Sequence, residues 1–173
     1  MQAAWSTVLC VSLAFGCAPA QTAASIGAQA SDRETRALGR AALRAVVGPF
    51  VCTAQAPCRV LQIDPAVRRS RDMGLPDTVD RVLARLEPSD VADLSTPHVL
   101  LESIARSRRQ APPSDTTWLW MAWPDERGPR PATDRILNVL VESDYEMYGL
   151  PLRVTLRRLS GGWTVVHVQP SQG

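Results

Sequence analysis

Alternating apolar and polar residues mark segment 152–169 as a pair of antiparallel strands. Leu152, Val154 and Leu156 alternate with arginine and threonine, so one face of the first strand is apolar and the other is basic. A Ser-Gly-Gly sequence follows at 160–162, and glycine adopts at little cost the positive φ that a three-residue hairpin loop needs. We therefore predict a β-hairpin closed by a three-residue loop.

The length of this loop decides which residues share a face. A three-residue loop gathers the apolar residues on one inner face and turns His167 outward. The predicted pairs are Leu159 with Trp163, Leu156 with Val166, and Val154 with Val168. Any ligand pocket is then expected on the inner face, beside Leu152, Val154, Leu156, Val166 and Val168.

Apolar residues recur at helical spacing in the first half of the chain. Ser31 and Glu34 form a capping box, which predicts a helix that starts at Ser31 and stops at Gly48-Pro49. The apolar stripe is Leu38, Ala41, Ala42 and Ala45, and the opposite stripe is Arg33, Arg36, Arg40 and Arg44. Two further helices are predicted, one over 77–86 and one that begins at Thr96-Pro97 and ends before Pro112-Pro113.

Period-two patterns predict the remaining strands. A short strand covers 59–63 and is closed by Asp64-Pro65, and a second begins at Thr116 with Trp118 and Trp120 on one face. Segment 136–141 is apolar on both faces, as in a central strand. Segment 145–159 is extended, with a bulge or bend at Gly149 and Pro151.

This order of helix, strand, helices and four final strands predicts an α+β domain, with N-terminal helices packed on an antiparallel sheet that ends in a four-stranded meander. The element order and the Gly-Gly-Trp-Thr-Val-Val-His-Val strand at 161–168 resemble the nuclear-transport-factor-two-like superfamily, which includes SnoaL-like and ketosteroid-isomerase-like proteins. The resemblance covers residues 33–170. It implies a strongly curved sheet that wraps around the helices to form a pocket, in enzymes and in binding domains alike.

Residues 1–20 have the features of an export signal, with an apolar core at 8–15. Two processing sites compete. Ala18-Pro19-Ala20 predicts cleavage before Gln21, whereas Leu13-Ala14-Phe15-Gly16-Cys17 resembles a bacterial lipoprotein signal, with Cys17 as the acylated residue. Residues 21–32 are then expected to be a flexible tether, and residues 33–173 a single domain.

Charge and composition exclude several functions. The net charge of +2 is too small to indicate nucleic-acid binding, and every one of the 19 basic residues is arginine. Without lysine there is no Schiff-base or pyridoxal-phosphate anchor, no phosphate-binding loop and no Ser-x-x-Lys pair. Cys52 and Cys58 are the only cysteines after the export signal, which predicts a disulfide in an exported protein.

The candidates for chemistry are few. Neither His167, on the outer face of the hairpin, nor His98 is predicted to be catalytic, and their separation gives no metal-ligand spacing. Glu142, Asp144 and Glu146 surround a turn but lack a calcium-loop pattern. The aromatic residues are more suggestive, because they could line an apolar pocket and stack on a ligand. The predicted pocket residues are Trp118, Trp120, Tyr145 and Tyr148.

These observations predict an exported or lipid-anchored bacterial envelope protein with a non-catalytic domain that binds a small apolar ligand or an envelope protein. No cofactor, metal or nucleic acid is expected, and contact with a membrane is expected only through a lipid on Cys17. The alternatives are a small SnoaL-like enzyme that uses a buried carboxylate or His167, and a module that binds partners through its arginine patches.

Overall fold

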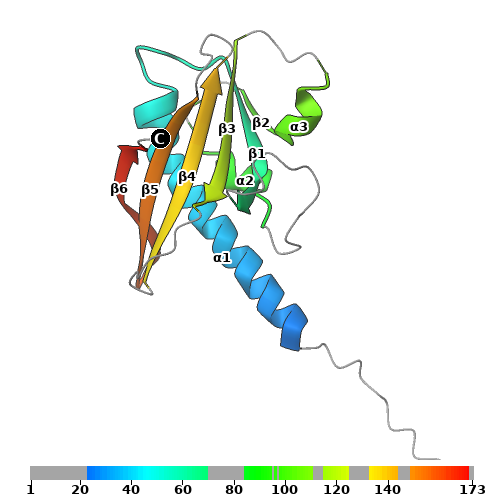
Figure 1. Cartoon of the computed structure of the whole chain (residues 1–173), viewed down its shortest axis with the longest axis vertical. Helices are drawn as coiled ribbons and strands as arrows, with labels where there is room; N and C mark the ends of the chain where they lie inside the picture. Colours follow the sequence, from blue (N-terminus) through cyan, green and yellow to red (C-terminus); the bar gives the residue numbers. More distant parts are fainter. Residues whose placement is uncertain are drawn as a thin grey trace, which may run out of the picture.

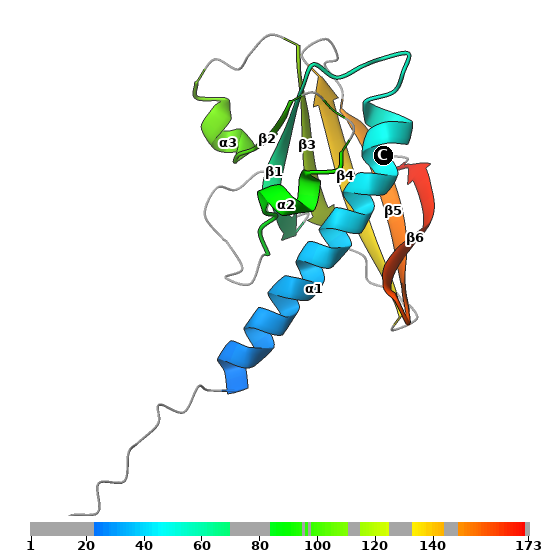
Figure 2. The ribbon, with the colours of Figure 1, turned by 180° about the vertical axis from the view of Figure 1, so that it is seen from behind.

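A computed structural model places one long helix and two short ones around a six-stranded sheet (Figure 1). It describes residues 23–69, 84–94, 96, 98–110, 115–124, 133–143 and 149–171. The strand order is β2-β1-β3-β4-β5-β6, and the helix α1 crosses one face of the sheet (Figure 2). The α+β class is confirmed. The prediction of an antiparallel sheet is wrong in part, because β1 runs parallel to both of its neighbours.

Helix α1 spans Ala23–Val46 and begins well before Ser31. The predicted cap at Ser31 is therefore wrong, and the segment 21–32 that we expected to be a tether is helical from Ala23 on. The reason is local: alanine and glutamine are good helix formers, and no glycine-proline pair interrupts them. The end of α1 is as predicted, since a wide turn, η1 (Val47–Val51), follows and contains Gly48-Pro49. In both views the N-terminal part of α1 projects beyond the sheet (Figures 1 and 2).

The apolar stripe of α1 fills the space beneath the sheet. Leu38, Ala42, Leu43 and Val46 are buried, although Ala41 and Ala45 are only partly so. The arginine stripe is not merely solvated. Arg36 donates to Asp90 and Glu87 on the short helix α2 (Pro88–Val91) and its N-cap, with N–O distances of 3.0 Å and 2.7 Å. These ion pairs hold α2 against α1.

Strand β1 (Val60–Arg69) is longer than the predicted strand 59–63. It continues through Asp64-Pro65 because its pairing with β3 is irregular between Ile63 and Val67. Proline has no N–H to contribute to a strand ladder, so a bulge is one of the few places in a sheet that accept it. Beyond the bulge the pairing resumes, and Val67 returns to the core.

Among the described residues, neither of the two later predicted helices appears as predicted. Residues 77–83 lie outside the described part of the chain, Arg85 forms a β-bridge with Ala66, and Pro88 begins α2 instead of ending a helix. The region after Thr96 forms strand β2 (Val99–Leu101) and then one helical turn, α3 (Ile104–Ser107). Pairing of β2 with β1 satisfies backbone groups that a helix would otherwise satisfy, and this tertiary contact overrides the helical spacing.

The last four strands form the predicted antiparallel meander. They are β3 (Thr116–Trp123), β4 (Asp134–Ser143), β5 (Leu150–Leu159) and β6 (Gly162–Pro170). Their inner face is packed against α1, with Leu152, Val154 and Leu156 fully buried. The prediction of a pocket on this face is therefore wrong, because side chains fill it.

The hairpin register is correct in one half and wrong in the other. Val154 pairs with Val168 as predicted, but Leu159 pairs with Gly162 across a two-residue turn, not with Trp163. A bulge at Val166 joins the two registers, so that Leu156 faces Val165. Val165 consequently packs against the core and Val166 is 46% exposed, the reverse of the prediction.

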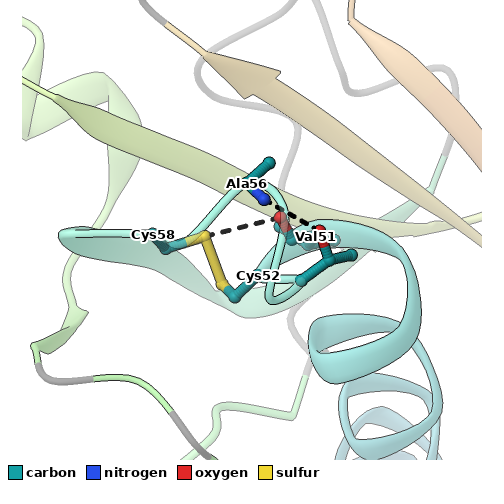
Figure 3. Close-up of a disulfide and its surroundings, with 5 residues drawn as sticks. Val51, Cys52, Ala56 and Cys58 are labelled. Atoms are coloured by element: carbon teal, nitrogen blue, oxygen red, sulfur yellow. Dashed lines mark hydrogen bonds between the residues drawn. A yellow bond between two sulfur atoms is a disulfide. The ribbon is translucent and has the colours of Figure 1, made fainter.

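Cys52 and Cys58 form the predicted disulfide, with their Cα atoms 4.9 Å apart (Figure 3). The bridge closes the loop between η1 and β1. Inside the loop, the backbone N–H of Ala56 donates to the hydroxyl of Thr53 over 3.1 Å, and the Cys58 Sγ lies 3.6 Å from the Val51 carbonyl oxygen. The disulfide thus connects the end of the helical region to the first strand of the sheet.

Candidate functional site

Trp118 and Trp120, two of the four predicted pocket residues, lie on the face of the sheet away from α1. Leu119 and Met121 alternate with them along β3 and are fully buried on the α1 side. Tyr145 and Tyr148 lie outside the described residues, as does Cys17. The candidate site is therefore built around the two tryptophans.

A cavity of about 150 Å³ opens beside Trp120, where α3 and the residue after it lie against β1 and β3. Its lining consists of Asp64, Arg68, Ile104, Ala105, Arg108, Trp120 and Met121. We call this cavity the Trp–Arg pocket. A space of this size accommodates about five water molecules or one benzene-sized group.

The single turn of α3 positions one wall of the pocket. Ile104 is 4% exposed, and the Ser107 hydroxyl donates to the side-chain oxygen of Gln62 over 2.8 Å. Gln62 is fully buried and is the strand partner of Trp118. These contacts place α3 on the same face of the sheet as the indoles and bring the next residue, Arg108, over them.

Arg108 is held by both aromatic and ionic contacts. Its guanidinium carbon lies 5.2 Å from the ring centroid of Trp118 and 5.6 Å from that of Trp120, which is cation–π distance. The guanidinium also forms an ion pair with Glu142 on β4, the strand partner of Trp118. Such an arrangement orients the guanidinium without using all five of its N–H donors.

Asp64 is the buried carboxylate of the pocket, with only 3% of the residue exposed. Burial raises the pKa of Asp64 above its ordinary value, although the Ala66 N–H, which donates to Oδ1 over 3.1 Å, acts in the opposite direction. Arg68 also favours the charged form, donating to Oδ2 over 2.7 Å. Both oxygens of Asp64 therefore already accept hydrogen bonds within the chain.

Three buried N–H donors on this face have no hydrogen-bond partner among the described residues. They are the side-chain amide nitrogen of Gln62 and the indole nitrogens of Trp118 and Trp120. A buried donor without a partner costs about 1–3 kcal/mol, so most native structures provide one from protein, water or ligand. The cluster therefore indicates a place where something outside the chain supplies hydrogen-bond acceptors.

Sequence reasoning identifies the indoles but misses the residues that surround them. The Trp-x-Trp spacing is sufficient to predict that both side chains share a face of a strand. The predicted strand 59–63 ends before Arg68, and the helix predicted after Thr96 includes Arg108, but Arg68 lies in β1 and Arg108 directly follows α3. The observed positions depend on the parallel pairing of β1 with β3 and on the short α3, neither of which local spacing indicates.

His167, the other candidate for acid–base chemistry, lies away from the Trp–Arg pocket. His167 is exposed, and its imidazole hydrogen-bonds the side-chain oxygen of Gln169 on the same strand over 2.9 Å. Four strand spacings of about 4.8 Å separate its strand β6 from β1, so roughly 19 Å lies between His167 and Asp64. His98 is exposed, and Asp144 and Glu146 lie outside the described residues. Within the described ranges, no group of three or more His, Cys, Asp or Glu side chains could hold a metal ion.

Comparisons of this chain with protein-family models, with curated proteins and with solved structures give no match. In the part of the chain that the structure describes, no helix is both long enough and apolar enough to span a membrane. The resemblance to the nuclear-transport-factor-two-like superfamily stays a hypothesis.

Proposed function

We propose that this chain is an exported, non-catalytic binding domain of a bacterial envelope, and that the Trp–Arg pocket is its ligand site. The observation that carries the proposal is the cluster of three buried N–H donors without a partner among the described residues, next to a cavity large enough for a small molecule. Because the unpaired groups are donors, the ligand must bring hydrogen-bond acceptors. This differs from the apolar ligand that the aromatic residues alone suggested.

The indole N–H groups provide a direct test of this proposal. A ¹H–¹⁵N spectrum of the chain from Gln21 contains four indole signals, from Trp118, Trp120, Trp123 and Trp163. Phenylalanine substitutions assign the signals of Trp118 and Trp120. A panel of single-ring fragments of positive, negative and zero charge is then titrated into the protein.

We expect at least one fragment to shift the Trp118 and Trp120 signals saturably while that of Trp163, on β6, stays in place. Trp163 is a matched control because it packs against the core on the α1 side of the sheet. If no fragment moves the Trp118 and Trp120 signals, or if all four signals move together, the pocket is not a ligand site and the proposal fails.

A second candidate function is acid–base catalysis by Asp64, as the resemblance to SnoaL-like enzymes implies. The raised pKa of the Asp64 carboxyl favours it, since such shifts suit a general acid or base. Against it, both Asp64 oxygens are engaged by Ala66 and Arg68, and His167 is too far away to assist. Turnover of a bound fragment that is abolished by Asp64→Asn would favour the enzyme over the binding domain.

The site of export processing is part of the proposal and can be tested separately. If Cys17 is acylated, cells that express the full chain incorporate labelled palmitate into it, and Cys17→Ala abolishes the label. Cleavage before Gln21 would instead give an unlabelled, soluble exported protein in both cases. Retention of the unprocessed chain in the cytoplasm would contradict export by either route.

A further inference from the structure

The size of the Trp–Arg pocket limits its ligand to a small molecule. Its volume of about 150 Å³ is that of a cavity that holds one benzene ring. Ile104 and Ala105 contribute apolar surface and Trp120 an aromatic ring, which together suit a flat or compact body. A fused two-ring body would not fit entirely within this volume.

The unpaired hydrogen-bonding groups in and beside the pocket favour a ligand that brings acceptors. Three buried side-chain N–H groups there have no partner among the described residues. They are the indole of Trp120, which lines the pocket, and the amide of Gln62 and the indole of its strand partner Trp118. They do not bond to Asp64, the carboxylate that lines the pocket, whose two oxygens accept from Ala66 and Arg68 instead. A ligand that offers only donors would leave these N–H groups without acceptors.

The arginines of the pocket favour an anionic ligand. Arg68 and Arg108 line the pocket, and each pairs with one carboxylate, Asp64 or Glu142, through a single nitrogen, Nη2. A guanidinium has five N–H donors, so both arginines keep donors that these ion pairs do not use. Guanidinium groups bind carboxylates strongly, because their planar N–H forks match the two oxygens.

We propose that the Trp–Arg pocket binds a small organic carboxylate whose body is no larger than one six-membered ring. The carboxylate accepts from the guanidinium of Arg108 and from the indole N–H of Trp120, the indole that lines the pocket, and the ring lies against Ile104. Arg108 is oriented for this contact by Glu142 and by both indoles. The inference rests on the proposed function, since it specifies the ligand class of the same site.

Benzoate, benzamide, benzylamine and 2-naphthoate serve as probes, with the Trp120 indole signal of the full exported chain as the readout. We expect benzoate to shift this signal saturably. Benzamide should bind at least roughly tenfold more weakly, because it loses one charge-assisted hydrogen bond. Benzylamine and 2-naphthoate should not shift it. Arg108→Gln should weaken benzoate binding by about tenfold or more.

Arg109→Gln is the matched control, because Arg109 is the exposed neighbour of Arg108 and does not line the pocket. If Arg108→Gln lowers the melting temperature, Arg108→Lys replaces it as the test variant, since lysine keeps the charge but loses the planar pair of N–H donors.

Equal losses of benzoate affinity in the Arg108 and Arg109 variants would overturn the inference, because they would indicate a general electrostatic attraction without a specific contact. Binding of benzamide or benzylamine as tightly as benzoate would overturn the carboxylate class while leaving the proposed function intact. A Trp120 signal that no probe moves would sink both.

Discussion

The bulge in β6 gives the sharpest prediction about this fold. With a two-residue turn alone, Val154 would face His167, and the imidazole would be turned toward the core. The bulge at Val166 inserts one residue and restores the pairs Val154 with Val168 and Thr155 with His167. It therefore determines which of two adjacent valines faces inward, and aspartate at each position in turn tests it.

The expected magnitudes follow from the environments of the two valines. Val165 packs against the core, so Val165→Asp loses roughly 1.5 kcal/mol of apolar burial and also sets a carboxylate against apolar side chains at a cost of several kcal/mol. Val166 is 46% exposed, and an exposed substitution typically changes stability by about 0.5 kcal/mol or less. Both variants share the low strand propensity of aspartate, so that contribution cancels in the comparison.

Urea unfolding followed by tryptophan fluorescence measures both variants under the same conditions. Since a domain is typically stable by about 5–15 kcal/mol, Val165→Asp should lose a large share of that stability and Val166→Asp very little. The milder pair Val165→Ala and Val166→Ala should keep the same order. If Val166→Asp were the more destabilising variant, the three-residue loop without a bulge would be the correct register and the bulge would be wrong.

Three further predictions concern stability. Because burial raises the pKa of Asp64, the folded chain keeps the carboxyl proton to higher pH than the unfolded chain does. The stabilisation from this proton is complete below the unfolded pKa and is lost as pH rises through the folded pKa. Asp64→Asn should therefore flatten the fall in the free energy of unfolding between acid and neutral pH, and an unchanged slope would refute this. Asp134 should behave in the opposite way, because hydrogen bonds from Arg157 lower its pKa. The stabilisation from the ionised Asp134 is present above the unfolded pKa and is lost as pH falls through the folded pKa. Asp134→Asn should therefore remove this loss of stability in acid, as measured by the free energy of unfolding. Replacing both Cys52 and Cys58 by alanine should cost on the order of 2 kcal/mol, or roughly 5–10 °C in melting temperature by calorimetry, and an unchanged melting temperature would show that the bridge does not constrain the unfolded chain.

The features that could be predicted from the sequence are those that depend on neighbouring residues. Alternation along β3 predicts that Trp118 and Trp120 share a face, and it does so whatever the strand pairs with. The disulfide follows from two cysteines and a short loop, and the end of α1 from a glycine-proline pair. In each case the local pattern and the tertiary structure agree.

The features that could not be predicted depend on contacts between distant segments. Helical spacing after Thr96 is real, but pairing of β2 with β1 competes with it and prevails. The continuation of β1 past Pro65 depends on β3, which accommodates a bulge opposite it. The surroundings of the indoles are of the same kind, because Gln62 and Arg108 reach them only through this pairing and through α3.

The unpaired N–H groups of Gln62, Trp118 and Trp120 are regarded as part of a binding site because leaving them unpaired is energetically costly. Three buried N–H groups without partners would cost together roughly 3–9 kcal/mol, which approaches the whole stability of a typical domain. Acceptors from water in the cavity, or from a ligand that replaces this water, would recover that cost. A ligand that pairs with the donors binds only the folded chain, so it should also raise the free energy of unfolding in proportion to the logarithm of its concentration. The same groups that are costly without partners would therefore make the ligand-bound domain more stable.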